Sequence, residues 1–150
     1  MTQKIDELDI KIIRELRKDA RQSFYDLAKK LKVAEGTIYN RVNKLQESGV
    51  IKGYSAKVDF SKLGYDLVVI IGVSVKGKHL IEIEKEIAKE KNVSAVYDVT
   101  GEYDAIIVAN FKTRDELNKF VKKILGMKYV KRTYTMLVLN IWKDIHGVDI

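Results

Sequence analysis

The sequence contains no cysteine and no proline, and it has only two histidines among 150 residues. Without cysteine the chain can form no disulfide, no thiolate nucleophile and no cysteine-ligated metal site. The lack of proline, with 33% charged residues, hints at a heat-tolerant source. His79 and His146 lie far apart, and no nucleophile elbow, phosphate-binding glycine loop or metal-ligand spacing appears. We therefore expect no enzyme, no metal site and no cofactor.

Long apolar runs are missing as well. The longest extends from Leu67 to Val73, whereas a transmembrane helix needs about 20 apolar residues. The N-terminus, Met1 to Glu7, lacks the apolar core of a signal peptide. We expect a soluble, cytoplasmic protein that does not enter a membrane.

The charge is basic, with a net value of +7 and a pI of about 9.4. Residues 1–55 carry 12 basic against 8 acidic side chains, and residues 56–150 carry 16 against 13. The first part is therefore the more basic per residue. This balance suits an anionic partner such as nucleic acid, although a soluble basic protein without such a partner shows it too.

Three short helices are predicted in the first fifty residues. Apolar residues recur at helical spacing from Asp6 to Lys18, and Ser23 begins a capping-box-like start of a second helix that ends near Lys32. After a turn of a few residues, a third helix is predicted from Gly36 to Ser48, with Gly49 as its C-terminal stop.

The third helix has an exposed face whose groups suit DNA. Arginine and lysine suit guanine edges or phosphate, asparagine suits adenine, and threonine reaches phosphate. The face carries Glu35, Thr37, Tyr39, Asn40, Arg41, Asn43 and Lys44. A short turn between two helices followed by such a face is typical of a helix-turn-helix. A plain three-helix bundle with a solvated polar face fits the spacing too.

A strand is predicted next, over residues 50–58, as a wing or a link to the following domain. Beyond a turn-rich boundary at residues 59–65, the order is β-α-β-β-α-β, which is ferredoxin-like. The strands are expected at 66–75, 93–100, 104–111 and 133–142, and the helices at 78–90 and 113–125. Because Leu67–Ile71 and Ile106–Ala109 offer apolar side chains to both sheet faces, we expect another subunit to cover the second face.

The fold class predicted from these patterns is α+β. A winged-type helix-turn-helix domain occupies residues 1–50, a linking strand and hinge residues 51–65, and a ferredoxin-like domain residues 66–150.

The chain resembles the Lrp/AsnC family, also called feast/famine regulators, over nearly its whole length, and it is archaeal-like. The segments that carry the resemblance are Leu8–Ile13, Asp19–Arg21, Leu27–Leu31, Thr37–Ile51, Leu63–Tyr65 and Gly101–Asp104. The resemblance implies a transcription regulator that binds pseudo-palindromic double-stranded DNA. It also implies homodimers through a RAM/ACT-like C-terminal domain, their assembly into octamers (tetramers of dimers), and an amino-acid effector between subunits.

The resemblance also indicates the site residues. DNA binding is assigned to Ser23, Thr37, Tyr39, Asn40, Arg41 and Lys44. Effector binding is assigned to the family's Gly-Asp-Tyr-Asp-like turn and to the last strand, namely Gly101, Glu102, Tyr103, Asp104, Thr133 and Thr135. Asp104 would bind an ammonium group, while backbone amides near Gly101 and the two threonine hydroxyls would bind a carboxylate. A plain hairpin turn is the alternative for Gly101–Asp104.

Two other functions fit parts of the sequence. A small-molecule-binding module without a DNA role would have a similar C-terminal domain, but it does not explain the basic third helix. An RNA-binding sheet would need an aromatic-rich motif, which Tyr97 and Phe111 do not reproduce.

Overall fold

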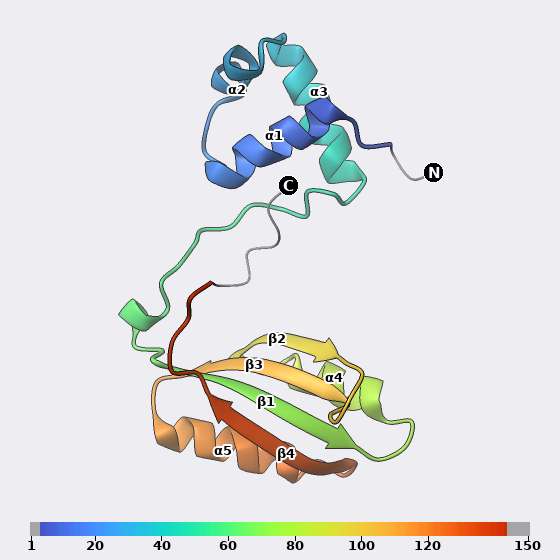
Figure 1. Cartoon of the computed structure of the whole chain (residues 1–150), viewed down its shortest axis with the longest axis vertical. Helices are drawn as coiled ribbons and strands as arrows, with labels where there is room; N and C mark the ends of the chain where they lie inside the picture. The colour runs from blue at the N-terminus through green and yellow to red at the C-terminus, as the bar shows by residue number, and fades with distance from the viewer. Residues whose placement is uncertain (1–3, 144–150) are drawn as a thin grey trace. The chain divides into compact units, whose positions relative to one another are not determined.

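The computed structural model describes residues 4–143, which form two compact units (Figure 1). The first unit extends to Lys57 and the second begins at Val58, so the predicted hinge, residues 51–65, is divided between them. His146 and the end of the predicted C-terminal domain lie outside the described residues. No helix within residues 4–143 has the length and apolarity needed to cross a membrane.

The first unit consists of three helices around one apolar core. They are α1 (Glu7–Lys18), α2 (Phe24–Leu31) and α3 (Glu35–Glu47). Each contributes a stripe of apolar residues at helical spacing, so the three stripes meet. The buried residues are Ile12, Leu16, Leu27, Ala28, Ile38, Val42 and Leu45.

Local hydrogen bonds set where these helices begin. Asp6 and Asp9 form a reciprocal capping box at the start of α1. The predicted start of α2 at Ser23 is confirmed, since its hydroxyl accepts a bond from the Asp26 amide at 3.0 Å. Helix α2 ends at Lys32 in the left-handed conformation, with φ of 57°, and only residues 32–34 separate it from α3. These features form the turn of a helix-turn-helix.

The strand predicted over residues 50–58 does not form. The amide of Ile51 bonds to the carbonyl of Leu45 at 2.9 Å, which closes α3, and the chain then continues without regular structure to the short 3-10 helix Ser61–Leu63. High β-propensity does not make a strand when no neighbouring strand accepts its hydrogen bonds. Within residues 4–143 the helix-turn-helix therefore has no wing.

The second unit has the predicted β-α-β-β-α-β order. Its elements are β1 (Leu67–Val75), α4 (Leu80–Ile87), β2 (Val93–Asp98), β3 (Ala105–Phe111), α5 (Arg114–Leu125) and β4 (Val130–Leu137). The sheet order is β2-β3-β1-β4 and all neighbours are antiparallel. The last strand begins and ends earlier than the predicted 133–142. It ends at Leu137 because its partner β1 begins at Leu67, and the last bond joins the Val138 amide to the Val68 carbonyl.

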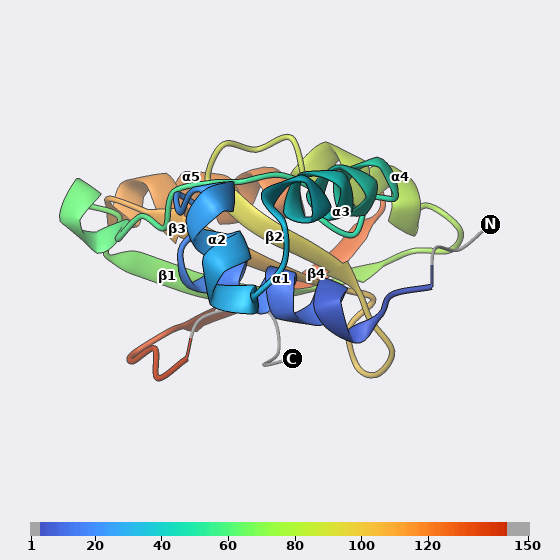
Figure 2. The same ribbon diagram turned by 90° about the horizontal axis from the view of Figure 1, so that it is seen from above.

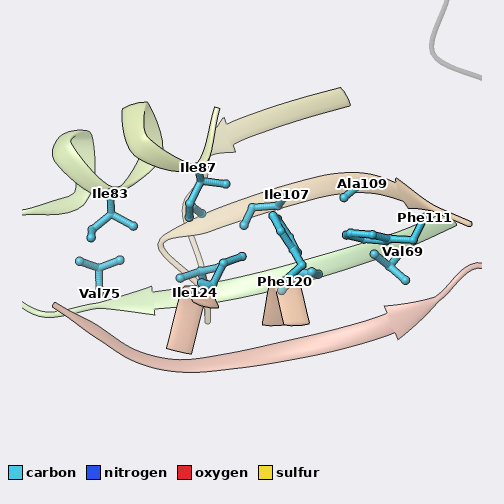
Figure 3. Packing of buried hydrophobic residues seen from close by; sticks show 12 residues of the cluster. Val69, Val75, Ile83, Ile87, Ile107, Ala109, Phe111, Phe120 and Ile124 are labelled. Carbon is cyan, nitrogen blue, oxygen red and sulfur yellow. The ribbon is translucent and has the colours of Figure 1, made fainter. Parts of the chain in front are cut away.

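Both helices of the second unit cover the same face of the sheet (Figures 1 and 2). Figure 3 shows the core between these helices and the sheet, in which side chains of β1 and β3 meet those of α4 and α5. It includes Val69, Ile71, Val73, Ile83, Ile87, Ile107, Phe111, Phe120 and Ile124. Packing of the helices on one sheet face thus accounts for the burial of every second residue in the central strands β1 and β3.

The opposite, open face of the sheet is also largely apolar. Residues that pair across antiparallel strands share a face. The pairs Ile70 with Val108 and Gly72 with Ile106 lie beside Tyr97 on β2 and Tyr134 and Met136 on β4. Tyr97, Tyr134 and Met136 are 42%, 56% and 38% exposed. This composition agrees with the expectation that both faces are apolar.

Candidate nucleic-acid interface and ligand site

The exposed side of α3 carries a continuous polar stripe. Its members recur at intervals of three and four residues, opposite the buried Ile38, Val42 and Leu45. They are the exposed Gly36, Tyr39, Asn40, Lys44 and Glu47 and the half-buried Asn43. The predicted residues Tyr39, Asn40 and Lys44 therefore share one surface. We call this set the α3 stripe.

The α3 stripe has the chemistry for base edges and phosphate. Asn40 and Asn43 each present an amide, which can donate to and accept from adenine together. Lys44 adds an ammonium group for phosphate. The sequence placed Asn43 on this side of the helix without assigning it a function. Its spacing of three residues from Asn40 and four from Tyr39 was the signal that could have identified it.

Helix α2 supports the α3 stripe, and two other predicted DNA-binding residues, Thr37 and Ser23, lie outside it. The ring of Tyr39 meets the ring of Phe24 edge-on, with centroids 6.2 Å apart, so α2 supports it. Thr37 is half-buried beside the stripe. The Ser23 hydroxyl donates to the Asp26 carboxylate at 2.6 Å and accepts from the Asp26 amide. In this structure Ser23 therefore serves the start of α2.

Arg41 borders the α3 stripe, three residues before Lys44, but its side chain is directed towards α1. It follows Ile38 by three residues and precedes Leu45 by four, and both of these are buried. Its guanidinium Nη1 donates to Asp6 and to both carboxylate oxygens of Asp9 at 3.2 Å, so it points to α1. The sequence grouped Arg41 with Asn40 as candidate base-reading residues, and the structure does not bring them together.

The ion pairs around Arg41 change the acidity of its neighbours. The Asp9 amide and the Arg41 guanidinium donate to the Asp6 carboxylate, which lowers the pKa of Asp6. The Asp6 carboxylate in turn raises the pKa of Arg41. The Asp6 carboxylate and the Arg41 guanidinium are therefore both charged at neutral pH.

The predicted effector turn is anchored to β1. The Asp104 amide bonds to the Val73 carbonyl at 2.9 Å, and the Asp104 carboxylate accepts the Val75 amide at 2.7 Å. Gly101 has φ of 128°, a conformation that favours glycine. The turn is thus tied to the central strand by both the backbone and the side chain of Asp104.

Tyr103 lies flat against the open face of the sheet. A Cβ atom on Gly72 would approach the Cγ of Tyr103 to 2.7 Å, so only glycine leaves room for the ring. The ring also stacks on Tyr134, with centroids 6.1 Å apart and planes inclined by 23°. Beside it, Arg132 Nη2 donates to the Glu102 carboxylate at 3.0 Å.

A hollow of about 610 Å³ lies next to these groups, lined by Glu102, Tyr103, Arg132, Thr133 and Tyr134. Arg132 and Tyr134 were missed by the sequence reasoning, although they alternate with the two predicted threonines along β4. Thr135 pairs with Ile71 and Thr133 with Val73, so both threonine side chains lie on the helix-covered side of the sheet. Of the six predicted residues, Glu102 and Tyr103 line the hollow together with Thr133, although the Thr133 side chain is directed to the other side of the sheet.

Comparisons with known proteins match both units. Residues 5–46 match the AsnC-type helix-turn-helix domain, and residues 68–148 match the Lrp/AsnC ligand binding domain. The chain belongs to the Lrp/AsnC family. It is a helix-turn-helix transcriptional regulator with an Lrp/AsnC ligand-binding domain, and it is not an enzyme.

Several relatives of this Lrp/AsnC protein are archaeal. An uncharacterised HTH-type transcriptional regulator of Pyrococcus abyssi is 52% identical over 140 residues, which cover 93% of this chain and 95% of the relative. The HTH-type transcriptional regulator Ptr1 of Methanocaldococcus jannaschii is 36% identical, with coverage of 93% and 95%.

Solved structures share the fold of this Lrp/AsnC protein. Escherichia coli AsnC has a TM-score of 0.88 and 30% identity, over 94% of this chain and 96% of that one. A transcriptional regulator of Neisseria meningitidis, solved as a complex with L-Met, has a TM-score of 0.90 and 23% identity, with 97% of each chain covered.

Proposed function

We propose that this Lrp/AsnC protein is a cytoplasmic regulator that binds pseudo-palindromic double-stranded DNA as a dimer, under the control of an amino acid. The observation that carries the DNA part is the α3 stripe. It collects two amides, a phenol and an ammonium group, with the carboxylate of Glu47 at its C-terminal end, on the solvent side of the second helix of a helix-turn-helix. Such a helix enters the major groove with its polar side toward the base edges.

The DNA contacts divide into two kinds. Asn40 and Asn43 read base edges, with Tyr39 beside them, and Lys44 and Thr37 contact phosphate. Affinity from the phosphate contacts falls with salt, because binding releases counterions. Two subunits related by a two-fold axis would place their α3 helices in successive major grooves, about 34 Å apart, which requires a pseudo-palindromic operator.

The dimer forms through the open face of the sheet. Its exposed Tyr97, Tyr134 and Met136, together with half-buried side chains such as Ile70 and Val108, make an apolar surface on a domain of modest size. Surfaces of this kind mark protein interfaces. A second copy provides a matching apolar surface, and dimers of this kind then join into octamers, each a tetramer of dimers.

The effector binds beside the turn Gly101–Asp104. A free amino acid needs acceptors for its ammonium group and donors for its carboxylate. Glu102 supplies a carboxylate, while Arg132 and backbone amides near Gly101 supply donors. The Neisseria meningitidis protein of the same fold, solved with L-Met, supports an amino acid as the ligand class. Binding would shift assembly, and with it the spacing of the DNA-binding helices.

The test combines mass and DNA binding on the full chain. Light scattering is measured without ligand and with each of the common amino acids, and gel shifts use the protein's own promoter region at fixed salt. A multiple of the dimer mass, a ligand-dependent change and a specific complex are expected. A monomer without DNA binding would overturn the proposal. An oligomer that binds DNA but ignores every amino acid would remove the effector part alone.

A further inference from the structure

One arginine and two aspartates join the start of α1 to the middle of α3. A single guanidinium nitrogen of Arg41 donates to Asp6 and to both oxygens of Asp9. The same two aspartates form the capping box of α1, in which each accepts the other's backbone amide at 3.0 Å. We call Asp6, Asp9 and Arg41 the α1–α3 clamp.

The clamp is costly to open. Asp9 is completely buried, whereas the side chain of Arg41 is 33% exposed and that of Asp6 is 45% exposed. Removing the cation of a buried carboxylate is strongly destabilising, because the charge is left without a compensating partner. Arg41 cannot leave for a DNA phosphate or a guanine without leaving Asp9 with only its backbone partner.

The position of the clamp gives it control over α3. Contacts from Ile38, Val42 and Leu45 are apolar, and the hydrophobic attraction that holds them is non-directional. The Arg41 bonds are directional and join α3 to a capped helix end that has its own fixed geometry. They therefore set the rotation of α3 about its axis, and hence the direction of Asn40 and Asn43.

We infer that Arg41 is a positioning residue for DNA recognition, acting through Asp6 and Asp9 and making no contact with DNA. This inference rests on the proposed binding of DNA through α3. The alternative is that the two aspartates merely mask a DNA-binding arginine. It predicts the opposite change in DNA affinity when the clamp is opened. If the clamp positions α3, opening it weakens specific binding. If the clamp masks Arg41, opening it strengthens binding.

The test uses Asp6→Asn in the full chain. Asparagine is as good an N-cap as aspartate, so α1 keeps its start while Arg41 loses one charged partner. Glu7→Gln is the matched control, since it removes the same charge from the same helical turn and Glu7 pairs with Lys11 within α1. The probes are a duplex selected from a random pool by the unaltered protein and a scrambled duplex of equal length. Affinities are measured over a series of salt concentrations, and thermal midpoints confirm folding.

We expect Asp6→Asn to weaken binding to the selected duplex about tenfold, comparable with the loss of one base-pair contact. The affinity for the scrambled duplex should stay unchanged. The salt dependence should be unchanged, because no phosphate contact is lost. Arg41→Ala removes both ion pairs and should lose at least as much specific affinity, and adding Asp6→Asn to it should cause no further loss. A stability defect alone would not change the ratio of specific to non-specific affinity at a temperature where the variants are folded.

Three outcomes overturn the inference. Tighter binding by Asp6→Asn to both duplexes would show a masked DNA contact. A salt slope that falls by about one in Arg41→Ala would show a phosphate contact. A result equal to that of Glu7→Gln would show that the clamp does not matter. Failure of the unaltered protein to select any duplex would overturn the proposed function itself, and the inference with it.

Discussion

Replacing Gly72 with alanine tests the close packing of the effector turn on the sheet. The new Cβ would lie 2.7 Å from the Cγ of Tyr103 and 2.8 Å from each Cδ atom. Carbon atoms normally approach to about 3.5–4.0 Å, so the ring must move by about 1 Å. Since Cγ is close to the backbone, a side-chain rotation alone gives little relief, and the turn has to shift.

The energetic cost follows from this overlap. Overpacking of a well-packed site costs about 1–3 kcal/mol, and we expect Gly72→Ala to lower the free energy of unfolding by that amount. Removing the ring should relieve the clash. The double variant Gly72→Ala with Tyr103→Ala should therefore be more stable than the sum of the two single effects, a positive coupling that only neighbours show.

Scanning calorimetry at one protein concentration measures these changes in stability. Titration with amino acids measures whether the hollow still binds a ligand. Gly36→Ala is the control, because nothing lies within 4 Å of its added Cβ and alanine favours a helix over glycine by about 0.5–1 kcal/mol. Unchanged stability in Gly72→Ala, or additive effects in the double variant, would refute the packing of Tyr103 on Gly72.

Four further predictions concern other parts of the molecule. Ser23→Ala removes the hydroxyl that caps α2 and should cost about 1 kcal/mol of unfolding free energy, while Ser23→Asp should keep it; denaturant titration distinguishes them. Lys44→Ala should weaken binding equally on different duplexes and reduce the salt slope by about one, as gel shifts at several salt concentrations would show. The pKa of Asp6 is lowered in the folded state, so its contribution to stability is present above the ordinary aspartate pKa of about 3.9 and is lost as the pH falls through the folded value. Unfolding measured between pH 5 and about pH 2 should therefore show a shallower loss in Asp6→Asn than in the unaltered protein. Finally, Tyr97→Glu places a charge on the open sheet face at an exposed position that a monomer tolerates, and light scattering should show dissociation of the proposed dimer.

The regular elements could be predicted because their signals are local. Apolar spacing identified α1 to α3, α4 and α5, and Ser23 marked the start of α2. Strand boundaries were harder, because a strand exists only with a partner. The stretch 50–58 has strand-forming residues and no neighbour within residues 4–143, and β4 ends at Leu137 where β1 begins.

The site residues depended on more than spacing. Tyr39, Asn40 and Lys44 could be placed on one surface from the helical period alone. Arg41 could not, because its direction depends on the carboxylates of Asp6 and Asp9, which come from 35 and 32 residues earlier in the chain. A guanidinium group suits DNA, but that of Arg41 is already bonded to the carboxylates at the start of α1.

The sequence by itself determined the order of the elements, the apolar stripes, the apolar character of both sheet faces and the resemblance to the Lrp/AsnC family. These properties depend on interactions within a few residues, or on composition. Only the tertiary structure decided that Arg41 joins α1, that Tyr103 needs Gly72 beneath it, and that Thr133 and Thr135 lie on the helix-covered side of the sheet. Each of these depends on register and packing between distant segments, which local patterns do not encode.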